Sequence, residues 1–286
     1  MSNNVSDKRL LVVLAHPDDE SFGMGGTLAH YAELGVAVHL VCATRGEAGT
    51  VDEEFLAGYK SIAQLRETEL RCAAKALGLA SLSFLDYRDS GMAGSPDNHH
   101  GQAFVNAPLH EVAEKVVRHI RRIRPQVVLT FDPVGGYHHP DHIAIHKATL
   151  RAFEAAPDEG SFPGAGKAFA PEMLYYNAIS RRSLRRTVLL MRITGKDPSK
   201  VGRNRDTDLT MLARDPDTPP HVSISYKTVE ARKRAADACH ASQLSGGWGR
   251  ISFLELYYHL VGRSERFTRA YPPTTGDYRS NDLFAS

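Results

Sequence analysis

Residues 10–26, LLVVLAHPDDESFGMGG, lead an apolar run directly into a turn that holds one histidine and three acids. An apolar run without polar alternation predicts a strand that is buried on both faces, as in a parallel sheet. The same order, an apolar strand and then an amphipathic helix, repeats through the first 150 residues. We expect strands at 9–15, 36–44, 82–87 and 126–132, and helices at 26–35, 63–78 and 110–125.

This alternation predicts an α/β fold, a Rossmann-like, doubly wound and mostly parallel sheet with right-handed crossovers and a C-terminal elaboration. The pattern weakens beyond residue 150, where Gly, Pro, Asp and Arg are frequent. Residues 229–244 predict a late helix, and 253–262 fit either a strand or a helix. We therefore expect one domain over 1–286, with a core at 1–150, a variable insertion at 151–220 and a C-terminal completion at 221–286.

Composition narrows the class of protein. With 35 Lys and Arg against 33 Asp and Glu, the formal charge is +2, and no long basic stripe predicts a nucleic-acid partner. The polar N-terminus, and the absence of about 18 uninterrupted apolar residues, predict a cytoplasmic protein with no membrane partner. The widely spaced Cys42, Cys72 and Cys239 predict three buried free thiols and no disulfide. We expect the basic run RRSLRR (181–186) to be a solvated surface, and the oligomeric state, including a homo-oligomer, stays open.

Polar residues follow two of the expected strands. AHPDDES (15–21) follows the first, and FDPVGGYHHPDHIAIH (131–146) follows the fourth. Ligands bind beyond the carboxyl ends of the strands in such sheets, so we expect the two segments to form one site. Nitrogen and oxygen donors suit a divalent metal, with zinc ahead of iron, manganese or cobalt. From their spacing, we predict His16, Asp19 and His142 as the ligands. Three protein ligands leave a fourth position for water, as in catalytic metal sites.

Other acids and imidazoles have more than one interpretation. Asp18, beside the predicted ligands, is the predicted general base. His146 lies four residues after His142 on the same helical face and is a rival ligand. Glu20 fits either the electrostatics of a helix N-terminus or a hydrogen bond to His16.

A helix start is predicted at HHPDH (138–142). Pro140 suits a first helical position, which places His139 at the N-cap. His138 and His139 compete for one role, an imidazole that stabilises an oxyanion or protonates a leaving amine. Asp141 is expected to hold that ring through its other nitrogen.

AHPDDE (15–20) together with HPDH (139–142) resembles the PIG-L/LmbE-like family of zinc-dependent de-N-acetylases. The similarity continues through TRGEAGT (44–50), RPQVVLTFDPVGGYHHPDH (124–142) and RKRAADACHASQ (232–243), so it covers most of the chain. The resemblance implies the same three metal ligands, the same base and His139 as the acid or electrophilic imidazole. It also implies further roles, namely Asp141 as the orienting acid, Tyr137 as a mobile oxyanion donor, and Arg66, Asp89 and Met92 as substrate contacts.

DSGMAG (89–94) with GGYHHPDH (135–142) resembles the branch of this family that acts on low-molecular-weight thiols, the mycothiol and bacillithiol deacetylases and the thiol-conjugate amidases. This resemblance implies a zinc-dependent hydrolase that removes acetyl from an N-acetylglucosamine conjugate. An amidase for thiol S-conjugates or other N-acyl sugars, and a non-catalytic metal- or sugar-binding module, stay open. The acids next to GMGG (23–26) disfavour a dinucleotide site there, because they would face an anionic pyrophosphate. The sequence contains no G-x-S-x-G motif, so a serine hydrolase is also disfavoured.

Overall fold

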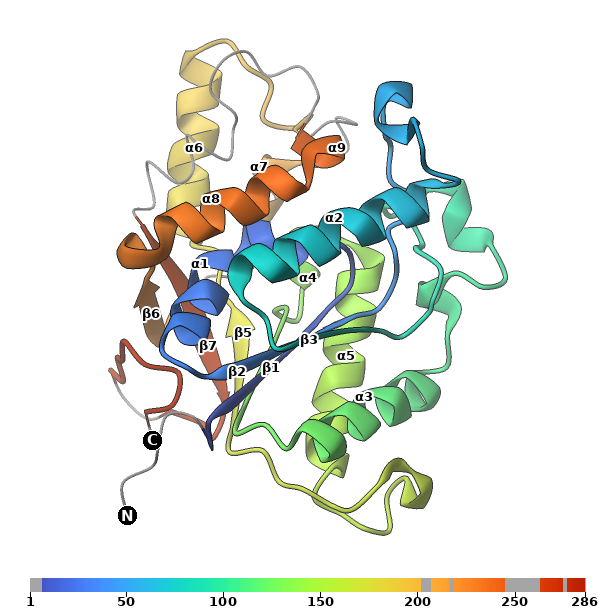
Figure 1. The fold of residues 1–286 in the computed structure, drawn as a ribbon. Helices are drawn as coiled ribbons and strands as arrows, with labels where there is room; N and C mark the ends of the chain where they lie inside the picture. Colours follow the sequence, from blue (N-terminus) through green and yellow to red (C-terminus); the bar gives the residue numbers. More distant parts are fainter. Residues whose placement is uncertain (1–6, 202–206, 217–218, 245–262, 275–276, 286) are drawn as a thin grey trace.

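The structure is a computed structural model that describes residues 7–201, 207–216, 219–244, 263–274 and 277–285. Its centre is a seven-stranded sheet in the order β3-β2-β1-β4-β5-β7-β6, with helices on both faces (Figure 1). The strands are β1 (Arg9–Leu14), β2 (Ala37–Cys42), β3 (Ser81–Phe84), β4 (Val127–Thr130), β5 (Met173–Asn177), β6 (Val222–Ser225) and β7 (Ser264–Tyr271).

Parallel pairing joins the first five strands. β1 pairs with β2 and β4, β2 with β3, and β4 with β5, all in parallel. β7 is antiparallel to both β5 and β6. The predicted α/β fold with a mostly parallel sheet is therefore confirmed, and β6 and β7 extend its edge from the C-terminal part of the chain.

Two groups of helices cover the sheet. α1, α2 and α8 pack together on one face, and α3 and α5 pack on the other (Figure 1). The helices are α1 (Asp19–Glu33), α2 (Ile62–Leu77), α3 (Leu109–Ile123), α4 (Gly135–His138), α5 (Pro140–Ala155), α6 (Arg181–Ile193), α7 (Leu209–Leu212), α8 (Glu230–Cys239) and α9 (Ala241–Leu244). Among the described residues, no helix combines the length and apolar character that crossing a bilayer requires.

α1 begins earlier than the predicted 26–35. It starts at Asp19, because the Asp18 carbonyl accepts the N–H groups of Ser21 and Phe22. The glycines inside α1 allow close packing, since a Cβ at Gly26 would lie 2.3 Å from the ring of Tyr226. The second and third acids of the opening stretch are therefore in a helical first turn.

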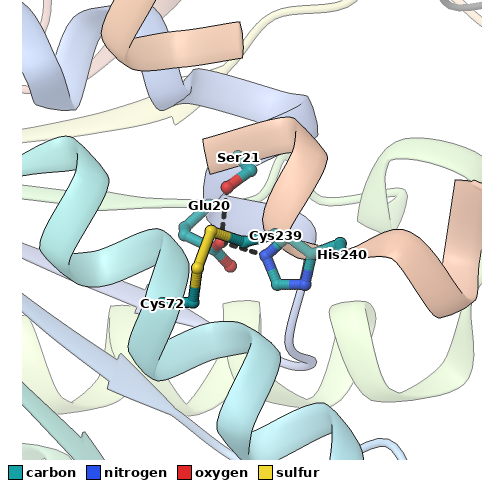
Figure 2. Close-up of a disulfide and its surroundings, with 5 residues drawn as sticks. All are labelled: Glu20, Ser21, Cys72, Cys239 and His240. Carbon is teal, nitrogen blue, oxygen red and sulfur yellow. Dashed lines mark hydrogen bonds and ion pairs between the residues drawn. A yellow bond between two sulfur atoms is a disulfide. The ribbon is translucent and has the colours of Figure 1, made fainter. Parts of the chain in front are cut away.

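The cysteine prediction is wrong for two of the three residues. Cys42 is buried with a free thiol, but Cys72 and Cys239 form a disulfide with a Cα–Cα distance of 5.7 Å (Figure 2). Cys72 is exposed on α2, and Cys239 ends α8. The two sulfurs meet because α2 packs against α8, a contact that 167 residues of separation conceal in the sequence.

The basic run 181–186 is only partly a solvated surface. It opens α6, where Arg182 and Arg186 are exposed but Arg181 and Leu184 are buried. The Arg181 guanidinium lies 3.4 Å from the Asp132 carboxylate, so a buried ion pair explains its burial. Segment 253–262, which fits either a strand or a helix by sequence, lies outside the described residues.

Candidate metal centre

The two polar segments meet where β1 and β4 end side by side. β1 leads into the turn before α1, and β4 leads through α4 into α5. Pro140 is the first residue of α5, and His139 is its N-cap, with Nδ1 accepting the Asp141 N–H at 3.2 Å. The predicted helix start is thus confirmed, and it turns the imidazole of His142 toward the end of β1.

His16, Asp19 and His142 lie close together. His16 Nδ1 is 3.2 Å from His142 Nε2 and 3.7 Å from Asp19 Oδ2, and His142 Nε2 is 3.3 Å from Asp19 Oδ1. Such a set of imidazole and carboxylate donors suits a divalent metal ion. Two further sets have one ligand atom each within 4.8 Å of the others, namely His16, His139 and His142, and His16, Asp89 and Asp141.

The electrostatics of this cluster favour a cation. Burial lowers the pKa of His16, but the carboxylate of Asp89, with that of Asp141, raises it well above its ordinary value. For Asp19, burial acts to raise the pKa and the adjacent His142 lowers it below its ordinary value. Oδ1 of Asp141 is buried without a hydrogen-bond partner among the described residues. A positive charge, from a proton or a divalent ion, would compensate these carboxylates.

Asp18 lies beside the cluster and has an unusual backbone. Its φ is 107°, a left-handed conformation that is rare outside glycine. Its Oδ2 accepts a hydrogen bond from Arg66 Nη2 at 3.0 Å. Burial raises the pKa of Asp18 to about 6, an effect that outweighs the attraction of Arg66. Arg66 thus holds this carboxylate beside the three-residue set, and a pKa of about 6 would suit a general base at neutral pH.

Arg66 supports the turn that carries Asp18. Its guanidinium is buried and donates to the carbonyls of Pro17 at 2.5 Å and Gly46 at 3.1 Å. A Cβ at Gly46 would lie 1.9 Å from Arg66 Nη1, so this close approach requires glycine. Such contacts favour a supporting role for Arg66, whereas the sequence predicts a substrate contact.

Asp89 is held close to His16. Its Oδ1 lies 3.4 Å from His16 Nε2 and accepts the Gly91 N–H at 2.8 Å, and its Oδ2 accepts the Ala48 N–H at 3.2 Å. Met92 lies in the same loop, where its carbonyl accepts the Ser95 N–H. Asp18 borders a cavity, and within the described part of the chain neither Asp89 nor Met92 lines that cavity. Their predicted role as substrate contacts stays a prediction.

Asp141 lies at a different imidazole from the one that the sequence suggests. Its Oδ2 is 3.1 Å from His16 Nε2 and accepts the Ser90 N–H at 2.9 Å. The carboxylate therefore orients His16, the usual arrangement of an acid behind a metal-binding histidine. Only the backbone N–H of Asp141 contacts the ring of His139.

Of the two candidate imidazoles, His139 faces the site. Its ring centre lies 4.5 Å from that of His16, whereas His138 Nε2 contacts Asp215 at 3.0 Å, and neither His138 nor Asp215 lines the cavity beside Asp18. His146 donates from Nδ1 to the Phe131 carbonyl at 2.8 Å, its ring centre lies 4.9 Å from that of Tyr176, and among the described residues it belongs to none of the sets whose ligand atoms converge. The structure thus distinguishes His139 from His138, and His142 from His146, which their spacing in the sequence leaves open.

Tyr137 packs against the ring of His142. Its ring centre is 4.9 Å from that of His142, and its side chain lines the pocket. Burial, with the charge of Asp19, raises the pKa of the Tyr137 phenol well above its ordinary value. The hydroxyl therefore remains protonated at neutral pH and can donate a hydrogen bond.

A cavity of about 390 Å³ opens beside these residues. Asp18, Asp19 and His142 form one part of its wall. α6, α7 and the loops beside them form another part, which is apolar and contains Ile179, Leu184, Val201, Leu209 and Leu212. The sequence pattern did not predict this apolar wall, because the alternation of strands and helices weakens beyond residue 150, in the segment that builds the wall.

Glu20 is shielded from solvent, and its hydrogen-bond partners among the described residues are Asp18, Ser21 and His240. It is fully buried, and its Oε1 lies 2.7 Å from Nε2 of His240 (Figure 2). The hydrogen bond to His16 considered from the sequence is therefore wrong. His240 belongs to the RKRAADACHASQ segment (232–243), in which no local pattern indicates a role for this histidine.

Comparison with known proteins agrees with this geometry. The model of the family described as "PIG-L: GlcNAc-PI de-N-acetylase" matches residues 11–153. The chain belongs to the PIG-L family. A relative in Geodermatophilus obscurus, a 1D-myo-inositol 2-acetamido-2-deoxy-alpha-D-glucopyranoside deacetylase, is 37% identical to this PIG-L protein, over 97% of each chain.

Two solved structures share the PIG-L fold. The N,N'-diacetylchitobiose deacetylase of Pyrococcus horikoshii has a TM-score of 0.63 and 21% identity, and covers 94% of this chain and 86% of its own. GalB of Pseudomonas putida, a 4-carboxy-2-hydroxymuconate hydratase, has a TM-score of 0.60 and 22% identity, with 94% and 98% covered. One fold thus occurs with two reactions, so the chemistry must be argued from the site.

Proposed function

We propose that this PIG-L protein is a divalent-metal-dependent hydrolase that removes acetyl from an N-acetylglucosamine conjugate in low-molecular-weight thiol metabolism of the mycothiol or bacillithiol type. The observation that carries the proposal is the convergence of His16, Asp19 and His142, with Asp18 beside them. The printed name of the Geodermatophilus relative, a deacetylase of an acetamido-sugar inositol glycoside, supports this substrate class.

The three converging residues, His16, Asp19 and His142, would hold the ion, which we propose to be zinc. When bound, it would act as a Lewis acid on the amide carbonyl and lower the pKa of water at the site. Asp141 and Asp89 support this assignment, because both carboxylates lie on the opposite side of the His16 ring, at Nε2.

The chain's own groups would move the proton and stabilise the developing charge. Asp18 accepts a proton as water adds to the acetyl carbon, and returns it to the nitrogen as the C–N bond breaks. The Nδ1 of neutral His139 accepts the Asp141 N–H, which leaves Nε2–H to donate to the oxyanion. Tyr137 can donate its hydroxyl to the same oxygen. Acetate and a free amino sugar leave.

The apolar wall favours a second candidate function, hydrolysis of an amide that carries an apolar substituent, such as a thiol S-conjugate. Leu184, Leu209 and Leu212 line the same cavity as the catalytic acids. An apolar surface of this kind binds apolar groups and offers few hydrogen-bond partners to a polyol.

We also propose that 1–286 is one domain in which the 151–220 insertion selects the substrate.

Acetate and amine release decide between these functions. The substrates are N-acetylglucosamine, its inositol and malate glycosides, and S-conjugates with polar and apolar thiol substituents. We expect acetate release from the glycosides. Cleavage of the S-conjugates alone would favour the amidase, and no turnover of any N-acyl substrate would favour a metal- or sugar-binding module. Elemental analysis of the purified protein identifies the ion, with iron, manganese and cobalt as the alternatives to zinc.

A further inference from the structure

Glu20 is a buried acid whose partners come from both ends of the chain. Glu20 and His240 are both 0% exposed, and Oε1 of Glu20 accepts from His240 Nε2 at 2.7 Å and from Ser21 Oγ at 2.6 Å (Figure 2). Burying a carboxylate is costly unless it is paired and hydrogen-bonded. An acid that only stabilised the N-terminus of α1 could remain in water, so this burial calls for another explanation.

The second oxygen of Glu20 reaches the backbone of the proposed base. Oε2 accepts the Asp18 N–H at 3.1 Å. Asp18 adopts φ 107°, a conformation that is unfavourable for a non-glycine residue and persists only when its surroundings enforce it. Arg66 holds the Asp18 side chain, and Glu20 holds its amide.

His240 is in turn fixed by its neighbours. It directly follows Cys239, which the disulfide joins to Cys72 on α2 (Figure 2). Nδ1 of His240 is buried and has no hydrogen-bond partner among the described residues, so within them Glu20 is the ring's polar partner. The position of the Glu20 carboxylate therefore depends on an imidazole anchored to α2 and α8.

We propose that Glu20 and His240 form a positioning pair that holds Asp18 in the conformation required of the base. This role rests on the proposed function. It acts through the Asp18 amide, so neither residue of the pair needs to contact substrate or metal. Asp18 supplies the chemistry, and the pair sets where its carboxylate lies.

The test compares Glu20→Ala with a matched control, Glu69→Ala. Glu69 is also a buried acid, and it accepts the N–H and hydroxyl of Ser242 at 2.8 Å each, two residues after His240, but its hydrogen bonds do not reach the Asp18 turn. We expect Glu20→Ala and His240→Ala to lower kcat about 10–100-fold with little change in KM, as loss of supporting hydrogen bonds does elsewhere. Glu69→Ala should keep the kcat of wild type in its folded fraction.

Conservative variants separate positioning from folding. Glu20→Gln retains an acceptor for the Asp18 N–H, the contact through which the pair acts, and its NH2 group can donate to Nε2 of His240 when the imidazole carries its proton on Nδ1, so it should recover most of kcat. Glu20→Asp keeps the charge but is one methylene too short to reach both partners, so it should be as slow as Glu20→Ala. This comparison remains decisive if the alanine variant fails to fold. Normal kcat in Glu20→Asp would overturn the proposal.

Amide hydrogen exchange of the metal-free protein gives a readout without turnover. The Asp18 amide should exchange faster in Glu20→Ala and Glu20→Asp than in wild type and Glu69→Ala. Unchanged protection of that amide would overturn the positioning role. If the wild type hydrolyses no N-acyl substrate, the proposed function fails, while the exchange of the Asp18 amide still tests the pair.

Discussion

At the scale of single residues, Asp18 combines a strained backbone with a buried carboxylate. Its φ of 107° and its contact with Arg66 place the carboxylate at the pocket wall, adjacent in sequence to Asp19. Strained residues of this kind are concentrated at functional sites. This geometry supports the proposed division of the two neighbouring acids, with Asp19 as a metal ligand and Asp18 as the base.

Replacing the base tests this division. We expect Asp18→Asn to lower kcat on the order of 10²–10⁴-fold, because the general base is lost. The metal content should stay that of wild type, since Asp18 is outside the three-residue ligand set. Activity assays and elemental analysis of the same preparation check both parts. Full turnover in Asp18→Asn would show that another group accepts the proton.

At the scale of secondary-structure elements, the disulfide joins α2 to α8 close to the site. Cys72 and Cys239 close a long loop, and such cross-links stabilise mainly by restricting the unfolded chain. We expect Cys72→Ser/Cys239→Ser to lose about 2–4 kcal/mol of unfolding free energy, measured by urea denaturation. A reducing agent should lower the stability of the wild type but leave the double variant unchanged. Equal wild-type stability with and without reductant would contradict this expectation.

α6 and α7 form the apolar wall of the pocket. Leu209 belongs to α7 and is buried within an apolar cluster that includes Leu184 and Leu212. If this wall binds an apolar substituent, Leu209→Ser should lower kcat/KM for an apolar S-conjugate about tenfold or more, the usual effect of losing a few apolar contacts. N-acetylglucosamine should be affected little. An equal loss for both substrates would indicate a general effect on folding.

At the scale of the whole molecule, the proposed metal would connect the ends of β1 and β4. A ligand that binds only the folded state stabilises it by about 2.7 kcal/mol at a concentration about 100 times Kd. We expect removal of the ion by a chelator to lower Tm, and addition of zinc to restore it. His16→Ala/His142→Ala should show neither effect. A wild-type Tm that is independent of zinc would argue against a site built by these residues.

The fold class, the start of α5 and the residues that gather at the proposed metal site could be predicted from the sequence. These features are local: apolar runs define strands, Pro140 and His139 define a helix start, and parallel strands bring their carboxyl ends to one edge. Four features became visible only in the folded structure: Asp141 supports His16, Cys72 meets Cys239, α6 and α7 form an apolar wall, and Glu20 pairs with His240. Each of these depends on packing between segments far apart in the chain, and no local pattern of residues records such packing.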